Sequence, residues 1–343
     1  MLTRSKNNPI LKPNPKNFWE SKKVYNPAAF YEDSRYYLFY RAIGSDWISR
    51  IGLAISPDGE NFSRFDKPVL EPVSELESKG VEDPRITKIN KTYYLTYTAY
   101  DGLTARLSLA VSNDLKNWQR RGVMLPNWDY VKAGGFILPW DKARSNPQAD
   151  QDWIKAGGIF PKIINGKYYM LFGGENLWLA SSTDGLKWQP ILEPFLRPRP
   201  DYFDSVHLEM GPAPIATEQG WLAIYHGIDQ KRTYRLGFLL LDLNDPAKIL
   251  YRSDQPIFAP TEPYELSGLV DVLPGGLAGM QKMSPDELDN FIKEATAKKI
   301  MPRVVFCCGA VLVGGILKLY YGAGDSVIGM AEAPLNDLLN LIK

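Results

Sequence analysis

The chain has 343 residues, of which 45% are hydrophobic and 23% are charged, and its formal net charge is +1. This balance excludes a strongly basic nucleic-acid-binding protein and an intrinsically disordered chain. Two adjacent cysteines, Cys307 and Cys308, exclude a disulfide-stapled scaffold, and two histidines, His207 and His226, exclude a histidine-rich metal site. We expect no metal, no nucleic-acid partner and no membrane partner, since no stretch approaches the roughly 20 apolar residues that span a bilayer.

A hairpin pattern recurs five times along the chain, each time as a short strand, a polar turn and an aromatic second strand. The hairpins cover residues 26–41, 83–98, 160–172, 211–225 and 308–321. A third strand follows each hairpin, and in the first three copies an aspartate turn and an aromatic residue open a fourth strand. Four antiparallel strands repeated five times predict an all-β fold, a five-bladed β-propeller; a β-sandwich is the alternative.

One segment interrupts the repeat before the fifth blade. Residues 283–299 read as a helix, with Ser284 as N-cap, Pro285 at the first helical position and Glu287 completing a capping box. The helical insertion covers about residues 271–303, and a lid, an oligomer contact and an inert surface excursion are all compatible with it. The start of the chain lacks the apolar core of a secretory signal, so we expect a cytoplasmic protein.

The hairpin geometry gathers charged residues at one rim of the predicted central channel. The start of a first strand and the end of the following strand lie at the same end of an antiparallel hairpin. The rim therefore collects Asn26, Glu82, Asp83, Lys155 and Glu209 from strand starts, Arg41, Asp101, Glu175, His226, Asp229 and Asp325 from strand ends, and Arg50 from a third strand. This mixture suits a small carbohydrate, because glycoside cleavage needs a carboxylic acid and either a second carboxylate or another nucleophile.

Several of these residues also have a simpler structural interpretation. A charged side chain at a strand end is most often only solvated. Arg85 would then pair with Glu82 in a structural ion pair, and His226, which follows an apolar strand, would be packed and neutral. His207 is predicted to lie in a loop and is assigned no role.

The chain resembles glycoside hydrolase family 130, the β-mannoside phosphorylases and β-mannosidases built on a five-bladed propeller. The matching stretches run in order over nearly the whole chain: Asn26-Pro-Ala, Tyr40-Arg-Ala, Ser49-Arg-Ile-Gly-Leu-Ala, Gly80-Val-Glu-Asp-Pro-Arg, Ile159-Phe-Pro-Lys-Ile, Gly211-Pro-Ala-Pro-Ile, Gly220-Trp-Leu-Ala-Ile-Tyr-His-Gly, Tyr264-Glu and Tyr321-Gly-Ala-Gly-Asp. The resemblance implies one catalytic propeller domain over residues 1–343.

The resemblance also implies roles for individual residues. Asp83 would be the general acid, acting through the 3-hydroxyl of the bound mannose, while Lys155 and His226 would hold inorganic phosphate. Positions that contact the mannosyl unit in the family match Asn26, Arg41, Arg50 and Asp325. We add three further residues to this substrate-binding set because of their places on the rim: Glu82, Asp101 and Asp229. Phosphate would attack the anomeric carbon with inversion and give α-mannose 1-phosphate. The expected reaction uses no cofactor, with phosphate as co-substrate.

Three departures from the family pattern leave the activity open. The segment at 127–153 is irregular, so Lys132, Arg144 or neither supplies a third phosphate ligand. Glu209 and Glu265 resemble carboxylates with which hydrolytic members activate water, so an inverting β-mannosidase is the alternative to a phosphorylase. A non-catalytic sugar-binding propeller is the third hypothesis. The insertion, the linkage (β-1,2 or β-1,4), the acceptor sugar and the oligomeric state, including a homo-oligomer, are left open.

Overall fold

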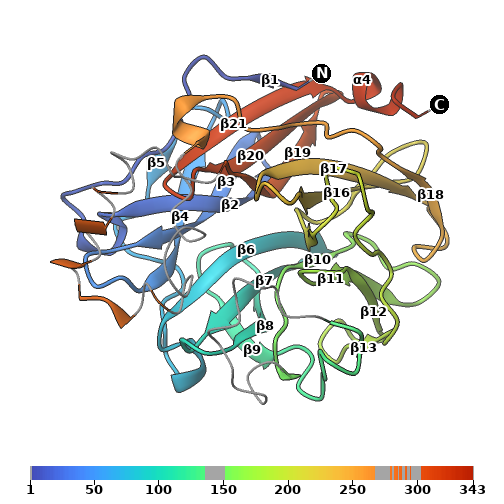
Figure 1. Ribbon diagram of the computed structural model, residues 1–343, viewed down its shortest axis with the longest axis horizontal. Coiled ribbons are helices and arrows are strands. Elements are labelled where there is room, and N and C mark those ends of the chain that lie inside the picture. Colours follow the sequence, from blue (N-terminus) through green and yellow to red (C-terminus); the bar gives the residue numbers. More distant parts are fainter. Residues whose placement is uncertain are drawn as a thin grey trace.

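The computed structural model describes residues 2–135, 151–266 and 303–342, together with residues 279, 282–284, 286, 287, 290, 291 and 294. This part of the chain is nearly all β, as the repeat of short apolar and aromatic runs predicts. Its named strands form four hydrogen-bonded sheets. Figure 1 shows the sheets side by side around a common centre.

The largest sheet joins two antiparallel meanders and contains the first two predicted hairpins. The first meander consists of β2 (Lys23–Glu32), β3 (Arg35–Ile43), β4 (Ser49–Ser56) and β5 (Ser63–Arg64). The second consists of β6 (Gly80–Ile89), β7 (Thr92–Tyr100), β8 (Ala105–Ser112) and β9 (Gln119–Val123). The parallel pair of Ser49 with Gly80 links β4 to β6.

Two further sheets follow in chain order. One contains β10 (Gly157–Ile159), β11 (Tyr168–Phe172), β12 (Trp178–Ser182) and β13 (Gln189–Pro190). The other contains β14 (His207–Met210), β15 (Ile215–Ala216), β16 (Trp221–Ile228), β17 (Tyr234–Leu241) and β18 (Ile249–Arg252). Both β14 and β15 pair with β16, because Pro212 and Pro214 between them have no N–H to donate to the ladder. The prediction that His207 lies in a loop is therefore wrong, since this residue opens β14.

The last sheet is completed by the opposite end of the chain. It contains β19 (Val305–Val313), β20 (Ile316–Ala323) and β21 (Val327–Pro334), and its fourth strand is β1 (Thr3–Arg4), which pairs with β21. In Figure 1 the N-terminal strand β1 lies alongside β21, close to the short helix α4 (Leu335–Leu339). The sequence repeat shows only three strands for this copy, because the fourth lies about 330 residues away.

In the described part of the chain, short 3-10 helices lie in the connections between strands: η1 (Phe18–Glu20), η2 (Glu75–Glu77) and η4 (Pro263–Glu265). In the predicted insertion, the capping box is present, because Ser284 N–H donates to Glu287 Oε2 (2.8 Å) and Glu287 N–H donates to Ser284 Oγ (3.4 Å). Residues 286, 287, 290, 291 and 294 are helical, and the rest of the predicted segment lies outside the described residues.

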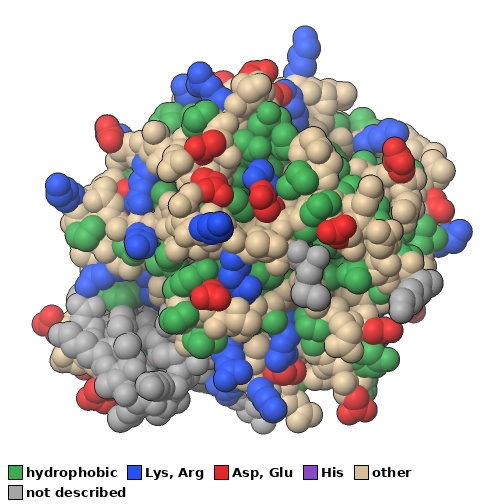
Figure 2. Space-filling model, turned by 90° about the horizontal axis from the view of Figure 1, so that it is seen from above, with side chains coloured by type: hydrophobic (Ala, Val, Ile, Leu, Met, Phe, Trp, Pro, Cys, Tyr) green, Lys and Arg blue, Asp and Glu red, His purple; other side chains and the backbone are tan. Residues whose placement is uncertain are grey.

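The core lies between neighbouring sheets and contains most of the aromatic second strands. Tyr40, Tyr97, Tyr225, Tyr320 and Tyr321 are all buried. The surplus of tyrosine over phenylalanine is thus mainly a matter of packing between sheets. In the face seen in Figure 2, basic and acidic side chains are interspersed, in keeping with a net charge of +1. The described helices include none with the length and apolar character to cross a membrane.

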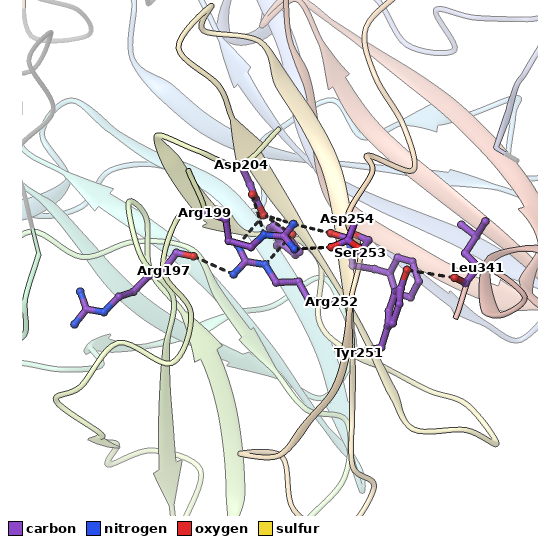
Figure 3. Close-up of polar contacts among 10 residues, drawn as sticks. Arg197, Arg199, Asp204, Tyr251, Arg252, Ser253, Asp254 and Leu341 are labelled. Atoms are coloured by element: carbon purple, nitrogen blue, oxygen red, sulfur yellow. Dashed lines mark hydrogen bonds and ion pairs between the residues drawn. The ribbon is translucent and has the colours of Figure 1, made fainter. Parts of the chain in front are cut away.

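A buried ion-pair network outside the centre ties β18 to the loop before β14 (Figure 3). Asp204 is fully buried, and its Oδ2 accepts hydrogen bonds from Arg252 (2.7 Å), Arg199 (3.1 Å) and the Tyr225 hydroxyl (2.7 Å). Arg199 also pairs with Asp254 at the surface (3.0 Å). Since every charge here has a partner within the network, we interpret it as a structural element.

Candidate functional site

Two β-bulges bring Asn26 and Asp83 together at the centre of the molecule. In β2, Asn26-Pro27 stand opposite Tyr40 alone, and in β6, Asp83-Pro84 stand opposite Tyr97 alone. A bulge accommodates a proline, which cannot donate to the ladder, and it redirects the side chain before it. Asn26 Nδ2 consequently donates to Asp83 Oδ1 at 2.9 Å.

Arg41 organises the carboxylates of the Glu82-Asp83 pair. Its guanidinium donates to Glu82 Oε1 (2.6 Å), Asp83 Oδ1 (3.2 Å) and Ser49 Oγ (3.0 Å), and Ser49 Oγ donates to the same Glu82 oxygen (3.0 Å). Burial raises the pKa of Glu82 to about 6; Arg41 opposes this shift and the neighbouring Asp83 charge adds to it. Glu82, directly beside the proposed general acid, can thus keep a proton at mildly acidic pH.

Arg85 has a structural role, but its partner is not the one predicted. Its guanidinium donates to the backbone carbonyls of Met210 (2.7 Å), Gly211 (3.2 Å) and Asp83 (2.9 Å). The predicted ion pair with Glu82 is wrong, because Arg85 is bound to these carbonyls while Arg41 and Ser49 bind the Glu82 carboxylate. Arg85 instead ties β6 to the end of β14 and holds the backbone of Asp83.

A second polar cluster adjoins the first and is centred on Glu209. Lys155 Nζ lies 2.9 Å from Glu209 Oε2, and His207 Nε2 lies 3.4 Å from the same oxygen. His207 Nδ1 faces Glu175 Oε1 at 3.8 Å, and the Tyr130 hydroxyl donates to Glu175 Oε2 (2.7 Å). The cluster therefore places Lys155 and His207 around the carboxylates of Glu209 and Glu175.

Interactions between charged groups shift the pKa values in this second cluster and couple it to the first cluster. Burial alone would lower the pKa of Lys155, but Glu209 and Glu175 offset this and raise it. Burial would likewise raise the pKa of Glu209, but Lys155 and His207 hold it well below its usual range. Asp83 contributes to the shift of Lys155, and Lys155 to that of Glu82, so both clusters belong to one site.

His226 is enclosed and neutral at physiological pH. Its Nε2 accepts a hydrogen bond from the Cys307 N–H (2.8 Å), and its ring stacks on Phe306 with centroids 3.9 Å apart. Burial lowers the pKa of His226 to about 3. These contacts match the packed, neutral interpretation, so His226 brings no positive charge to a phosphate and offers only the Nδ1–H as a donor.

The carboxylate of Glu265 is occupied by structural contacts. This fully buried side chain accepts hydrogen bonds from Arg4 Nε (2.8 Å) and Nη2 (2.7 Å), from the Tyr321 hydroxyl (2.7 Å), and from the N–H groups of Thr261 and Glu262. Five donors use all the lone pairs of a carboxylate. This arrangement speaks against the predicted alternative in which Glu265 activates water.

Three predicted substrate contacts are instead used in the turns between second and third strands. Asp101 accepts hydrogen bonds from the N–H groups of residues 103 and 104 and pairs with Arg106 (2.6 Å). Asp229 accepts hydrogen bonds from the N–H groups of residues 231 and 233 and pairs with Arg235 (2.7 Å). Arg50 pairs in the same way with Asp46 (2.8 Å). These local turn contacts hold each charged group and speak against the three predicted substrate contacts, which stay predictions.

Asp325 lies in the β20–β21 turn, on the site side of the last sheet. Burial raises its pKa, Lys23 and Arg41 oppose this, and Asp83 and Glu209 add to it. These charges place Asp325 beside both clusters. The neighbouring Gly322 is required here, because a Cβ at that position would stand 2.1 Å from Asn26 Oδ1.

Two residues beside these clusters, His207 and Lys23, were not among the residues predicted from the sequence for this site. Both lie two residues before a residue that contacts the clusters, so the alternation of side chains along a strand was the available signal. The two candidates for a third phosphate ligand stay open: Lys132 is exposed and pairs with Asp129 (3.1 Å), and Arg144 lies outside the described residues. Within the described ranges, no three His, Cys, Asp or Glu side chains are arranged to hold a metal ion.

Comparison with known proteins identifies relatives along the whole chain. The model of glycoside hydrolase family 130, described as beta-1,4-mannooligosaccharide phosphorylase, matches residues 2–274 and 300–343. A 1,2-beta-oligomannan phosphorylase of Thermoanaerobacter sp. (strain X514) is 35% identical, with 98% of each chain covered. A beta-1,2-mannobiose phosphorylase of the same organism is also 35% identical, with 96% of each chain covered.

A similar solved structure comes from the branch of the family in which hydrolysis is described. It belongs to work on GH130 glycoside hydrolases that target beta-1,2 mannosidic linkages in Candida mannan. That protein is 28% identical, with a TM-score of 0.76 over 98% of this chain and 94% of its own.

Proposed function

Because the chain belongs to glycoside hydrolase family 130, we propose that it cleaves β-mannosides with inorganic phosphate and releases α-mannose 1-phosphate. The observation that carries the proposal is a protonated Lys155 next to the Glu82-Asp83 pair, since a phosphate nucleophile needs a cation close to the acid. Relatives named as phosphorylases of β-1,2-linked mannosides, at 35% identity, support this activity and favour the β-1,2 linkage.

In this mechanism, Asp83 provides the proton and phosphate provides the electrons. The acid proton passes through the 3-hydroxyl of the mannosyl unit to the glycosidic oxygen, the bond from that oxygen to the anomeric carbon breaks, and a phosphate oxygen bonds to that carbon from the opposite face. Asn26 and Arg41 orient Asp83, and Lys155 donates to phosphate with the N–H groups that Glu209 leaves unused. Phosphate is already an anion, so the step needs no protein base.

Hydrolysis is the second candidate, and the structure of the β-1,2-mannosidase branch favours it. Glu209 would then activate water, and its Oε1 is buried without a hydrogen-bond partner. However, the pKa of Glu209 is held well below its usual range by Lys155, and a weakly basic carboxylate removes a proton poorly. This difference leads us to favour phosphorolysis.

The test is to incubate the protein with β-1,2- and β-1,4-mannobiose, each with and without phosphate, and to measure mannose 1-phosphate and free mannose. We expect mannose 1-phosphate only when phosphate is present, and faster with the β-1,2 isomer. Release of free mannose at the same rate without phosphate would show that the protein is a hydrolase.

The assignment of Asp83 predicts that Asp83→Asn lowers kcat by at least about 100-fold, the typical contribution of a general acid. Asparagine has the same shape and can still accept from Arg41, so the thermal unfolding midpoint should change little. Asp101→Asn serves as the matched control, since Asp101 is held in a turn by Arg106. Turnover by Asp83→Asn close to wild type would reject the general-acid role.

We further propose that the sheets form the five-bladed propeller expected from the repeat, as one catalytic domain over residues 1–343. In support, each sheet or meander contacts the next around the centre: β2 with β6, β6 with β10, β11 with β14, β17 with β19 and β19 with β2. We place the enzyme in the cytoplasm, because phosphorolysis conserves the glycosidic bond energy in a sugar phosphate that is useful inside a cell.

A further inference from the structure

Lys23 has an unusual environment at the start of β2. Only 5% of the residue is exposed, yet its ammonium has no hydrogen-bond partner among the described residues. Its Nζ lies 5.7 Å from the centre of the Tyr25 ring, and the guanidinium of Arg41 lies 4.8 Å from the same ring. Lys23, Tyr25 and Arg41 share one face of the β2–β3 pair, because Tyr25 is directly paired with Arg41.

This face leads directly to the proposed mannosyl site. Arg41 binds both carboxylates of the Glu82-Asp83 pair, and Asp325 faces Lys23 from the β20–β21 turn. Asn26 Oδ1, three residues from Lys23, is a second buried polar atom without a partner. Two unpartnered buried groups on one strand therefore flank the carboxylates.

A buried ammonium without a partner costs free energy that the fold alone does not recover. A methionine would fill the same volume at position 23 without that cost. The missing partner is thus best explained as a group that arrives with the substrate, and hydroxyl oxygens of a sugar are hydrogen-bond acceptors of the right kind.

We propose that Lys23 is a further substrate-binding residue, which together with Asp325 holds a pair of hydroxyl groups of the mannosyl unit. Lys23 donates to one hydroxyl oxygen and Asp325 accepts from the adjacent hydroxyl group. The inference rests on the proposed function, because it takes the bound sugar to be a mannoside.

The protonation of Lys23 gives the contact a pH dependence. Burial lowers the pKa of Lys23 to about 8, while Asp325 opposes this shift and Arg41 adds to it. Of the other groups that face it, Arg41 stays cationic and burial keeps the pKa of Tyr25 well above its usual value. Burial also raises the pKa of Asp325, and Lys23 and Arg41 oppose this shift. Lys23 loses its proton, and with it the charged donor, as the pH rises through about 8.

Calorimetric titration of β-1,2-mannobiose into the full chain without phosphate, at pH 6.5 and 9.5, tests the inference. At pH 6.5, Lys23→Met should weaken binding about ten- to a hundredfold, the range for a hydrogen bond from a charged group. At pH 9.5, the wild type should approach the affinity of Lys23→Met, whose own affinity should not change with pH. Lys23→Arg should bind equally at both pH values.

The controls separate this role from a structural one and from failure of the proposed function. Lys22→Met, at the neighbouring position, should bind like the wild type. Lys23→Met should unfold at the same temperature or higher, because it removes an unpaired buried charge. Unchanged affinity in Lys23→Met, or weaker binding accompanied by a lower unfolding temperature, would overturn the inference. If wild-type protein does not bind mannobiose at either pH, the proposed function fails instead.

Discussion

Backbone angles at the site mark where individual residues are held in an unfavourable conformation. Asn26, Asp83 and Asp325 have φ angles of 46°, 47° and 48°, in the left-handed region that non-glycine residues rarely adopt. Each such residue costs about 1 kcal/mol, so the surrounding structure must impose it. Bulges impose it at Asn26 and Asp83, and a tight turn imposes it at Asp325. The three positions coincide with the polar groups around the proposed mannosyl unit, as expected for strain retained for function.

At the same scale, Glu82 sets an expected pH dependence. Its pKa is raised to about 6, so Glu82 holds a proton below this pH and loses it as the pH rises. We predict that kcat/KM for β-1,2-mannobiose, at saturating phosphate, falls as the pH rises through about 6. Glu82→Gln removes this ionisation, so the pH profile of kcat/KM for this variant should lack the fall near pH 6.

The exposed Glu75 offers a control of the same chemistry, because Glu75→Gln changes a carboxylate outside the site. Its pH profile should match that of the wild type. If the Glu82→Gln profile still fell near pH 6, the fall would belong to another titrating group, such as phosphate itself.

Among the structural elements, the turns between second and third strands explain which charges are available to a ligand. Asp46 with Arg50, Asp101 with Arg106, and Asp229 with Arg235 repeat one contact in both meanders of the largest sheet and in the sheet of β14–β18. The repeat in the sequence predicted Asp101 and Asp229 at the ends of strands and Arg50 at the start of a third strand. It did not reveal that an arginine at the start of the next strand binds each aspartate, because this depends on how the turn folds.

Strand alternation explains both what was predicted at the site and what was missed. Asn26, Glu82, Asp83 and Lys155 could be predicted because they stand next to recognisable hairpins. His207 was missed although it alternates with Glu209 on β14, since two prolines separate β14 from β15 and make the strand hard to recognise. The environment of His226 depends on Phe306 and Cys307, about 80 residues away, and no local pattern reports such a contact.

The network of Figure 3 allows a stability prediction for one element, the β18 edge. Asp204→Ala leaves Arg252, Arg199 and Tyr225 without their buried acceptor, so we expect the free energy of unfolding to fall by about 3 kcal/mol. Asp254→Ala removes the exposed partner of the same Arg199 and should cost under about 1 kcal/mol. Urea denaturation of both variants measures the difference, and equal losses would contradict the assigned role of Asp204.

At the scale of the whole molecule, strand β1 joins the two ends of the chain, and its Arg4 binds one buried carboxylate, that of Glu265. Arg4 on β1 binds Glu265, donates to the Ala259 carbonyl (2.6 Å) and lies 4.2 Å from the centre of the Phe258 ring. The strand itself pairs with β21. The contacts of Arg4 therefore fasten the last sheet to the segment that precedes it.

Removing this cation should destabilise the entire fold. Arg4→Met leaves Glu265 buried without a counter-charge, and we expect a loss of about 3 kcal/mol in the free energy of unfolding. Glu265→Gln in the same chain should recover part of this loss, which a double-mutant cycle by urea denaturation measures. Lys6→Met, at an exposed position two residues later, is the control. No recovery in the double variant would show that the loss does not come from the unpaired carboxylate.

The pairing of β1 with β21 also has a consequence for synthesis. Residues 3 and 4 leave the ribosome about 330 residues before their partners at 331 and 332. The last sheet therefore cannot be completed until those partners are synthesised, and β1 stays unpaired until then. Closing so long a loop is slow, which makes this step a natural determinant of the folding rate. A circular permutation that places β1 directly after its partner β21 in the sequence would shorten that wait.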